Sequence, residues 1–195
     1  MQVEATRMGP SWNRLFELAA GQDGLFTTEQ AAGAGYSSQL LDHHVRGGNI
    51  IRVRRGIYRL VHFPTGEHED LVVAWLWSEQ AGVVSHQTAL SLNGLSDILP
   101  AHLHLTLPSD WRRRRLRVPP DVIIHHADVA SEDRAWFGAV PMTKPGRSLN
   151  DCAKAGLSPE HLQRAAAQAI QRGLVARSEL GAVEVALTPF GGLVA

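Results

Sequence analysis

The chain has 195 residues, 44% of them apolar, which is enough for one large domain or two small ones with packed cores. Lys and Arg together number 19, as do Asp and Glu, so the formal net charge of +0 excludes a uniformly basic nucleic-acid-binding surface. Any DNA site must therefore come from local clustering of charge. The single cysteine, Cys152, excludes an intramolecular disulfide and a cysteine-rich zinc site, and it suits a reducing compartment.

The sequence indicates neither a signal peptide nor a membrane span. It lacks a charged opening segment followed by an apolar run and a small-residue cleavage site, and no apolar run reaches the roughly 18 residues of a membrane helix. We therefore expect a soluble, cytoplasmic protein without a membrane partner.

Three short helices are predicted in the N-terminal part of the chain. The first helix is predicted to begin after Ser11 and to end at Gly21. The second begins after Thr27, which has the capping-box spacing to Gln30, and ends at Gly33. The third begins after Ser37 and ends at Gly47. The second and third helices are joined by a tight turn at Gly35, which is the layout of a helix-turn-helix.

From Asn49 the pattern alternates and predicts a β-hairpin, with strands over 50–54 and 57–60 around a turn at Arg55 and Gly56. The turn predicts the cross-strand pairs Arg54 with Ile57, Val53 with Tyr58, Arg52 with Arg59, and Ile51 with Leu60. One face would then be apolar and the other would carry Arg52, Arg54 and Arg59. We therefore expect a winged helix-turn-helix domain over residues 1–62.

Residues 63–67, with Pro64 and Gly66, are predicted to be a linker. Residues 67–188 then mix helices and strands, and residues 189–195 are predicted to be a frayed tail. Helices are expected over 69–80, 85–92 (capped by Ser85), 145–155, 159–172 and 178–186, with strands over 103–107 and 122–125. The predicted fold class is thus α+β, a winged helix-turn-helix followed by a mixed α/β C-terminal domain.

The third helix presents a polar face opposite its apolar stripe. If the stripe of Leu40, Leu41, His44 and Val45 faces the core, the opposite face carries side chains suited to reading base edges in a major groove. These candidate DNA-binding residues are Ser38, Gln39, Asp42, His43 and Arg46. The alternative is an ordinary solvated helix face.

Positive charge is concentrated around the predicted wing. Residues 36–61 contain five arginines and a single acidic residue, Asp42, which is the electrostatic pattern of phosphate contact. The wing candidates are Arg52, Arg54, Arg55 and Arg59, with surface charge for solubility as the alternative. A second run, Arg112, Arg113, Arg114 and Arg115, follows Trp111 and is predicted to bind phosphate, unless it is a solvated loop or a protein-binding surface.

No metal, cofactor or catalytic site is predicted. His102 and His104 would lie on one face of a strand while His125 and His126 point to opposite faces, and no HExxH or Cys-His pattern is present. We expect exposed strand-face histidines, and His86 as a polar first-turn residue. The acidic residues Asp121, Asp128, Glu132 and Asp133 lack a nearby lysine and a metal-binding order, and no phosphate loop, dinucleotide fingerprint or nucleophile elbow occurs, so we do not expect an enzyme.

Three segments, in this order, resemble the AbiEi antitoxin family of bacterial abortive-infection, type IV toxin-antitoxin systems. They are GNIIRVRRGIYR (48–59), VSHQTALSLNGL (84–95) and TKPGRSLND (143–151). The resemblance implies a repressor that binds double-stranded operator DNA of its own antitoxin-toxin operon. It also implies an antitoxin that counters a nucleotidyltransferase-type toxin without a stable complex. The run from Arg112 to Arg115 does not map onto the family pattern.

Two other functions remain open from the residues alone. One is a nucleic-acid-processing enzyme that its winged helix targets to DNA. The other is a transcriptional regulator whose C-terminal domain senses a small ligand.

Overall fold

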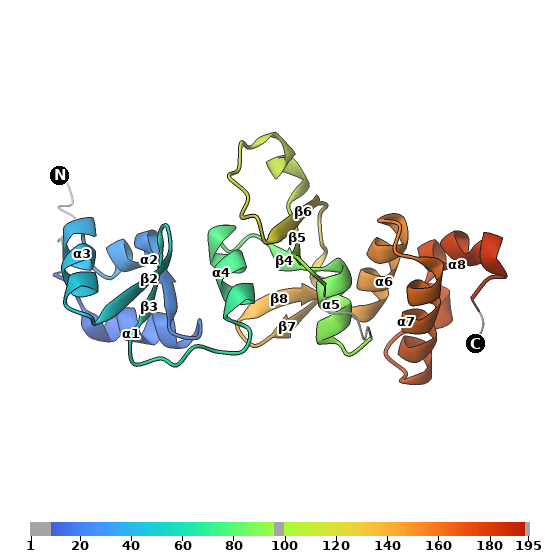
Figure 1. Cartoon of the computed structure of the whole chain (residues 1–195), viewed down its shortest axis with the longest axis horizontal. Helices are drawn as coiled ribbons and strands as arrows, with labels where there is room; N and C mark the ends of the chain where they lie inside the picture. Colours follow the sequence, from blue (N-terminus) through green and yellow to red (C-terminus); the bar gives the residue numbers. More distant parts are fainter. Residues whose placement is uncertain (1–8, 96–99, 194–195) are drawn as a thin grey trace, which may run out of the picture. The chain divides into compact units, whose positions relative to one another are not determined.

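The structure is a computed structural model that describes residues 9–95 and 100–193. The chain forms two compact units, called unit 1 (through Gln80) and unit 2 (from Ala81). Both units combine helices with a sheet (Figure 1), so the predicted α+β class is confirmed. Residues 1–8 of the predicted first domain and residues 194–195 of the predicted tail lie outside the described residues.

The three predicted N-terminal helices are present in unit 1. They are α1 (Trp12–Ala20), α2 (Thr28–Gly33) and α3 (Ser38–Arg46). The backbone N–H of Gln30 donates to Thr27 Oγ1 (3.1 Å), and that of Thr27 donates back to Gln30 Oε1 (2.8 Å). This capping box begins α2 where the sequence predicts it. Ser37 Oγ likewise accepts from the N–H of Leu40 (3.2 Å) at the start of α3.

A three-stranded antiparallel sheet completes the winged domain. Its strands are β1 (Leu25–Thr27), β2 (Ile50–Arg54) and β3 (Ile57–Leu60), in the order β1-β3-β2. The chain order α1-β1-α2-α3-β2-β3 is that of a winged helix-turn-helix, which confirms this part of the predicted fold. Strand β1 was not predicted, because three residues are too few to show an alternating pattern.

The predicted register of the β2–β3 hairpin is correct only next to the turn. Arg54 pairs with Ile57, but a β-bulge follows and Arg52 pairs with Tyr58. Because one extra residue reverses the faces of all the residues beyond it, the strand turns its other face to the core. Ile50 is therefore buried (1% exposed), while Ile51, predicted to be buried, is 39% exposed.

Unit 1 extends beyond the predicted linker. Helix α4 (Glu69–Trp77) packs against β1 and β3, and the Gln80 side-chain amide donates to Gln22 Oε1 (2.8 Å). The compact unit consequently includes α4 and ends after Gln80, whereas the sequence places the boundary at residues 63–67.

Unit 2 is built on a mixed five-stranded sheet in the order β6-β5-β4-β8-β7. Strands β5–β6 and β4–β8 pair parallel, and β4–β5 and β7–β8 pair antiparallel. The bounds are β4 (Val83–Val84), β5 (Leu103–Leu107), β6 (Val122–His126), β7 (Arg134–Phe137) and β8 (Val140–Thr143). The sequence predicts β5 and β6 and misses the other strands.

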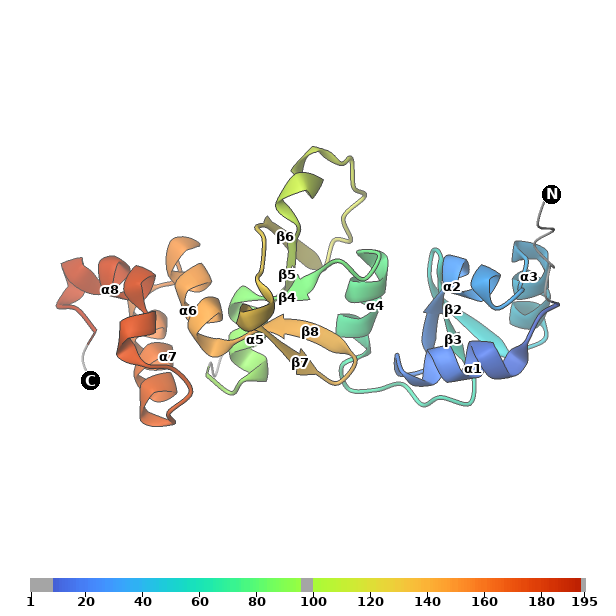
Figure 2. The ribbon, with the colours of Figure 1, turned by 180° about the vertical axis from the view of Figure 1, so that it is seen from behind.

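Helices of unit 2 pack into a second core around Leu149, Leu162 and Leu180. These helices are α5 (His86–Leu92), α6 (Pro145–Lys154), α7 (Pro159–Gln171) and α8 (Gly181–Leu187). The unit also contains four short 3-10 helices among the described residues: η1 (Ser109–Arg113), η2 (Ser131–Asp133), η3 (Arg177–Glu179) and η4 (Thr188–Phe190). Figure 2 shows α6, α7 and α8 gathered at the C-terminal end of this unit. α8 begins later than predicted because η3 takes its expected first turn.

The described part of the expected frayed tail is held in place. Residues 188–190 form η4, and the Leu193 carbonyl accepts from Arg177 Nη2 (2.8 Å). Leu193 is buried (4% exposed) in the core of unit 2, so the chain is anchored as far as that residue.

Among the described residues, no helix combines the length and the apolar character that crossing a bilayer requires.

Gly24 and Gly21 provide a matched pair for testing the packing of unit 1. Gly24 has φ +80°, and a Cβ placed there would lie 2.3 Å from Phe63 Cβ; one placed at Gly21 meets nothing closer than 3.7 Å. We predict that Gly24→Ala lowers the free energy of unfolding of unit 1 by about 2–5 kcal/mol, through backbone strain and overpacking. Gly21→Ala should change it by less than about 1 kcal/mol.

The free energy of unfolding of both variants is measured by urea titration, with hydrogen exchange of the β1 and β3 amides as the readout for unit 1. Equal stability of the two would contradict the close approach of Phe63 to Gly24.

Candidate nucleic-acid interface and histidine cluster

Helix α3 places its predicted polar face in solvent. Leu41 is fully buried and anchors the helix to the core of unit 1, together with the half-buried Leu40 and Val45. The exposed side chains are those of Ser38, Gln39, Asp42, His43 and Arg46. These five residues, called the α3 face, are the ones that the helical spacing places opposite the apolar stripe.

The wing is tied to the start of α2 through its turn. Gly56 adopts φ +78° between β2 and β3, and its carbonyl accepts from the backbone N–H of Thr28 (2.9 Å). Arg52 and Arg55 are exposed, and Arg54 is half-buried. The hydrogen bond to Thr28 holds the wing arginines at the helix-turn-helix rather than on a freely moving hairpin.

Arg59 does not share the exposure predicted for the wing arginines. Its side chain, 13% exposed, forms an ion pair with Glu69 of α4, and Nη1 also donates to Thr65 Oγ1 (2.6 Å). The β-bulge causes this difference, because it removes Arg59 from the face that carries Arg52 in the predicted register. Arg59 therefore links the wing to α4.

The arginine run lies on and after η1 in unit 2, and all four side chains are exposed. The guanidinium of Arg114 lies 3.8 Å from the ring centre of the buried Trp111, a cation–π contact. Arg112 Nη2 donates to the carbonyl of His126 (3.3 Å). Two of the four arginines are thus anchored to the fold, and Arg113 and Arg115 extend from a fixed segment.

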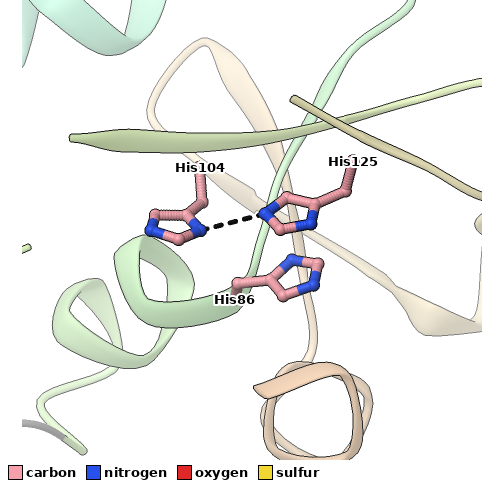
Figure 3. A group of neighbouring side chains, drawn as sticks. All are labelled: His86, His104 and His125. Carbon is pink, nitrogen blue, oxygen red and sulfur yellow. Dashed lines mark hydrogen bonds between the residues drawn. The ribbon is translucent and has the colours of Figure 1, made fainter. Parts of the chain in front are cut away.

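Three histidines from separate elements meet in unit 2 (Figure 3). His86 is the first residue of α5, His104 lies on β5 and His125 on β6. His104 Nδ1 and His125 Nε2 are 3.0 Å apart, and the His86 ring stacks on that of His125 with centroids 3.5 Å apart and an interplanar angle of 14°. One ligand-capable nitrogen from each ring lies within 4.8 Å of the others. We call these residues the histidine cluster.

Burial disfavours the charged forms of the three histidines. Burial, followed by the charges of His125 and His104, lowers the pKa of His86 to about 3. Burial and the charge of His125 lower the pKa of His104 to about 4. Burial also lowers the pKa of His125, although the Asp151 carboxylate opposes this shift. A neutral imidazole has one nitrogen lone pair, and burial favours this form in all three residues.

A buried hydroxyl pair supports His86. Its Nδ1 lies 2.9 Å from Ser85 Oγ, which accepts from Thr106 Oγ1 (2.7 Å). Ser85 was predicted to cap α5, but its side chain makes no cap hydrogen bond and faces these two residues instead. His86 itself has φ +53°, a conformation that costs a non-glycine residue about 1–2 kcal/mol and that clusters at functional sites.

The expectation of exposed strand-face histidines is wrong for His104 and His125, which are half-buried and paired, and His86 is 7% exposed. Sequence reasoning missed the cluster because parallel pairing of β5 with β6 brings the two strand histidines together, with His104 opposite Ile123 and Thr106 opposite His125. The only local signal was the alternation of His102 and His104 with leucines.

Two of the acidic residues considered for catalysis form contacts within the fold. Asp128 accepts from the backbone N–H (3.0 Å) and the hydroxyl (2.7 Å) of Ser109. Asp133 forms an ion pair with Arg147 (3.3 Å), whose Nε also donates to Asp151 (2.8 Å). These contacts hold η1 and α6 in place.

The winged domain has a family match. Residues 13–61 match the family of AbiEi antitoxin transcriptional regulators. The resemblance predicted from the sequence is confirmed over this segment, which covers α1 through β3. This family is described as one of transcriptional regulators that are AbiEi antitoxins. The later segments, residues 84–95 and 143–151, lie outside it.

Solved structures similar to this chain include one from a bacterium. The crystal structure of the RV2827C protein from Mycobacterium tuberculosis is similar, at 17% sequence identity and a TM-score of 0.47, over 96% of this chain and 80% of that one. A search of curated proteins finds no match.

The Ser85–Thr106 hydrogen bond can be tested by a double-mutant cycle. Thr106→Val keeps the side-chain shape but removes the buried donor, so we predict a loss of about 1–3 kcal/mol in the free energy of unfolding of unit 2. Ser85→Ala should cost a similar amount, and the double variant should cost less than the sum by at least about 0.5 kcal/mol. Urea unfolding measures the cycle, and strictly additive costs would contradict the contact.

Proposed function

We propose that this protein is a transcriptional autorepressor and antitoxin of a type IV toxin-antitoxin system. The winged domain binds double-stranded operator DNA of its own operon, and unit 2 supplies the antitoxin activity. The observation that carries the proposal is the exposed α3 face beside a wing that carries exposed arginines, within the segment that matches the AbiEi family.

Base reading is assigned to the α3 face. An amide such as that of Gln39 pairs with adenine, and a guanidinium such as that of Arg46 pairs with guanine, in the major groove. Ser38 can pair with either base, and Asp42 can accept from cytosine. The burial of Leu41 supports this assignment, because it orients these side chains away from the core at fixed angles.

Backbone contact is assigned to Arg52, Arg54 and Arg55 of the wing. A wing beside a recognition helix meets either the phosphates or the minor groove of the same site. Arg59 is not assigned a contact with DNA, because its guanidinium forms an ion pair with Glu69 within unit 1. Arg112, Arg113, Arg114 and Arg115 form a second candidate phosphate-binding patch in unit 2, supported by their exposure.

The toxin partner is proposed from the family resemblance. We infer a nucleotidyltransferase-type toxin that this protein opposes without forming a stable complex. The antitoxin in the name of the matched family supports opposition to a toxin, and the class of toxin rests on the resemblance alone.

The phosphate contacts can be tested with DNA from immediately upstream of the gene and with a random duplex of equal length. Arg52→Ala and Arg55→Ala should weaken binding to both duplexes, and each lost contact should flatten the slope of log K against log salt concentration by about one unit. Arg14→Ala, which removes an exposed arginine of α1 in the same unit, is the control and should leave the slope unchanged. Fluorescence anisotropy over a salt series measures both effects.

Gln39→Ala should instead reduce discrimination between the two duplexes, by about 1–3 kcal/mol at the base pair that it contacts. Binding to random DNA should be nearly unchanged. A wild-type protein that binds both duplexes equally, or cleaves them in the presence of a divalent metal, would overturn the repressor proposal.

The antitoxin activity can be separated from repression by expressing the adjacent gene from an unrelated promoter. We predict that its product arrests growth, and that both the wild-type chain and the Gln39→Ala, Arg55→Ala double variant restore growth, because neutralisation does not require operator binding. A growth assay in a host that lacks both genes provides the readout. Failure of the wild-type chain to restore growth would contradict the antitoxin role.

A further inference from the structure

The histidine cluster has the composition and spacing of a metal site. His86, His104 and His125 come from a strand-helix turn and two neighbouring strands, and one nitrogen of each lies within 4.8 Å of the others. We propose that these three residues bind one divalent transition-metal ion of the kind that prefers imidazole nitrogen, for which Zn²⁺ is the representative probe. This inference is independent of the DNA-binding proposal, because that proposal assigns no role to any of the three histidines.

Two of the three ligands are already close to the geometry of a bound ion. Two imidazole nitrogens on one tetrahedral Zn²⁺ lie about 3.3 Å apart, as follows from a Zn–N distance of roughly 2.0–2.1 Å. His104 Nδ1 and His125 Nε2 are 3.0 Å apart and face each other (Figure 3). The ion would therefore replace the proton that these two nitrogens share.

The proton balance of this exchange is simple. In the hydrogen bond between His104 and His125, one ring donates its N–H and the other accepts with its lone pair. When both facing nitrogens bind the ion, the donor ring carries its proton on its other nitrogen.

His86 supplies the third ligand by turning its ring. The His86 ring stacks on the ring of His125, so it must rotate about its Cβ–Cγ bond before one of its nitrogens can direct a lone pair at the ion. Its backbone, at φ +53°, holds the side chain over the two strands despite the conformational cost, and Ser85 Oγ beside Nδ1 is a partner that orients the ring. Metal-binding histidines are oriented by such second hydrogen bonds in most proteins.

Charged groups around the cluster favour a cation. The Asp151 carboxylate raises the pKa of His125 against the effect of burial, and Asp151 is itself 7% exposed. Arg147, whose charge opposes a cation near His86, forms ion pairs with Asp151 and Asp133. Three neutral histidines bind a divalent ion with a fourth position left for water or an anion, as in sites that bind an exchangeable ligand.

Titration of the metal-free full-length chain with Zn²⁺, against a chromophoric chelator, tests the site. We expect one ion per chain, and affinity reduced more than about tenfold by His104→Gln or His125→Gln. The matched controls are His102→Gln and His126→Gln, which remove neighbouring histidines that lie outside the cluster and should retain wild-type affinity. Unfolding curves recorded with EDTA show whether each variant is folded.

Two further readouts use the wild-type chain, so the test does not depend on the variants folding. Co²⁺ should give the visible absorption bands of a four-coordinate site at one equivalent. Zn²⁺ should protect the half-buried His104 and His125, but not the exposed His102, from acylation detected by mass spectrometry. Absence of binding, several weakly bound ions, or equal loss of affinity in the His102 and His126 variants would overturn the proposal.

Discussion

The burial of Leu41 is the contact on which the candidate DNA-binding surface depends. This side chain is fully enclosed in a core that also contains Phe26 and Tyr58, whose rings stack with centroids 5.8 Å apart. Because a helix advances by about 100° per residue, burying Leu41 determines which side chains of α3 face solvent. Ile50 and Leu60 of the wing strands enter the same core, so one set of apolar contacts orients both the α3 face and the wing.

Features encoded by local chemistry could be predicted from the sequence, and features encoded by pairing could not. The capping box of Thr27 and Gln30 and the N-cap at Ser37 depend on residues three positions apart, and both were found. The bulge at Val53 leaves no mark on the alternation of β2, because Ile50 and Ile51 are equally apolar and either could be buried. Strands β1 and β4, of three and two residues, are too short to show a period.

The two candidate sites also differ in whether local sequence or strand pairing determines them. The α3 face is a single helix surface, so its exposed residues follow from helical spacing alone. The histidine cluster joins residues 86, 104 and 125, which only the parallel β5–β6 pair and the turn before α5 bring together. Arg59 illustrates the reverse error, since its charge fits a DNA-binding wing, yet its partner Glu69 lies in a helix that the sequence places in another domain.

The most direct test of DNA recognition by α3 is site-directed cleavage by a chelated iron attached to single introduced cysteines. The chain is suited to this method because its native cysteine, Cys152, is buried, and burial raises the pKa of its thiol to about 12. Labels at Ser38→Cys and Arg55→Cys should cut upstream DNA at distinct, localised positions, the first inside the major groove of the operator and the second at its flank. Diffuse cutting from residue 38, or the same pattern from a label at Arg14→Cys on α1, would contradict recognition by α3.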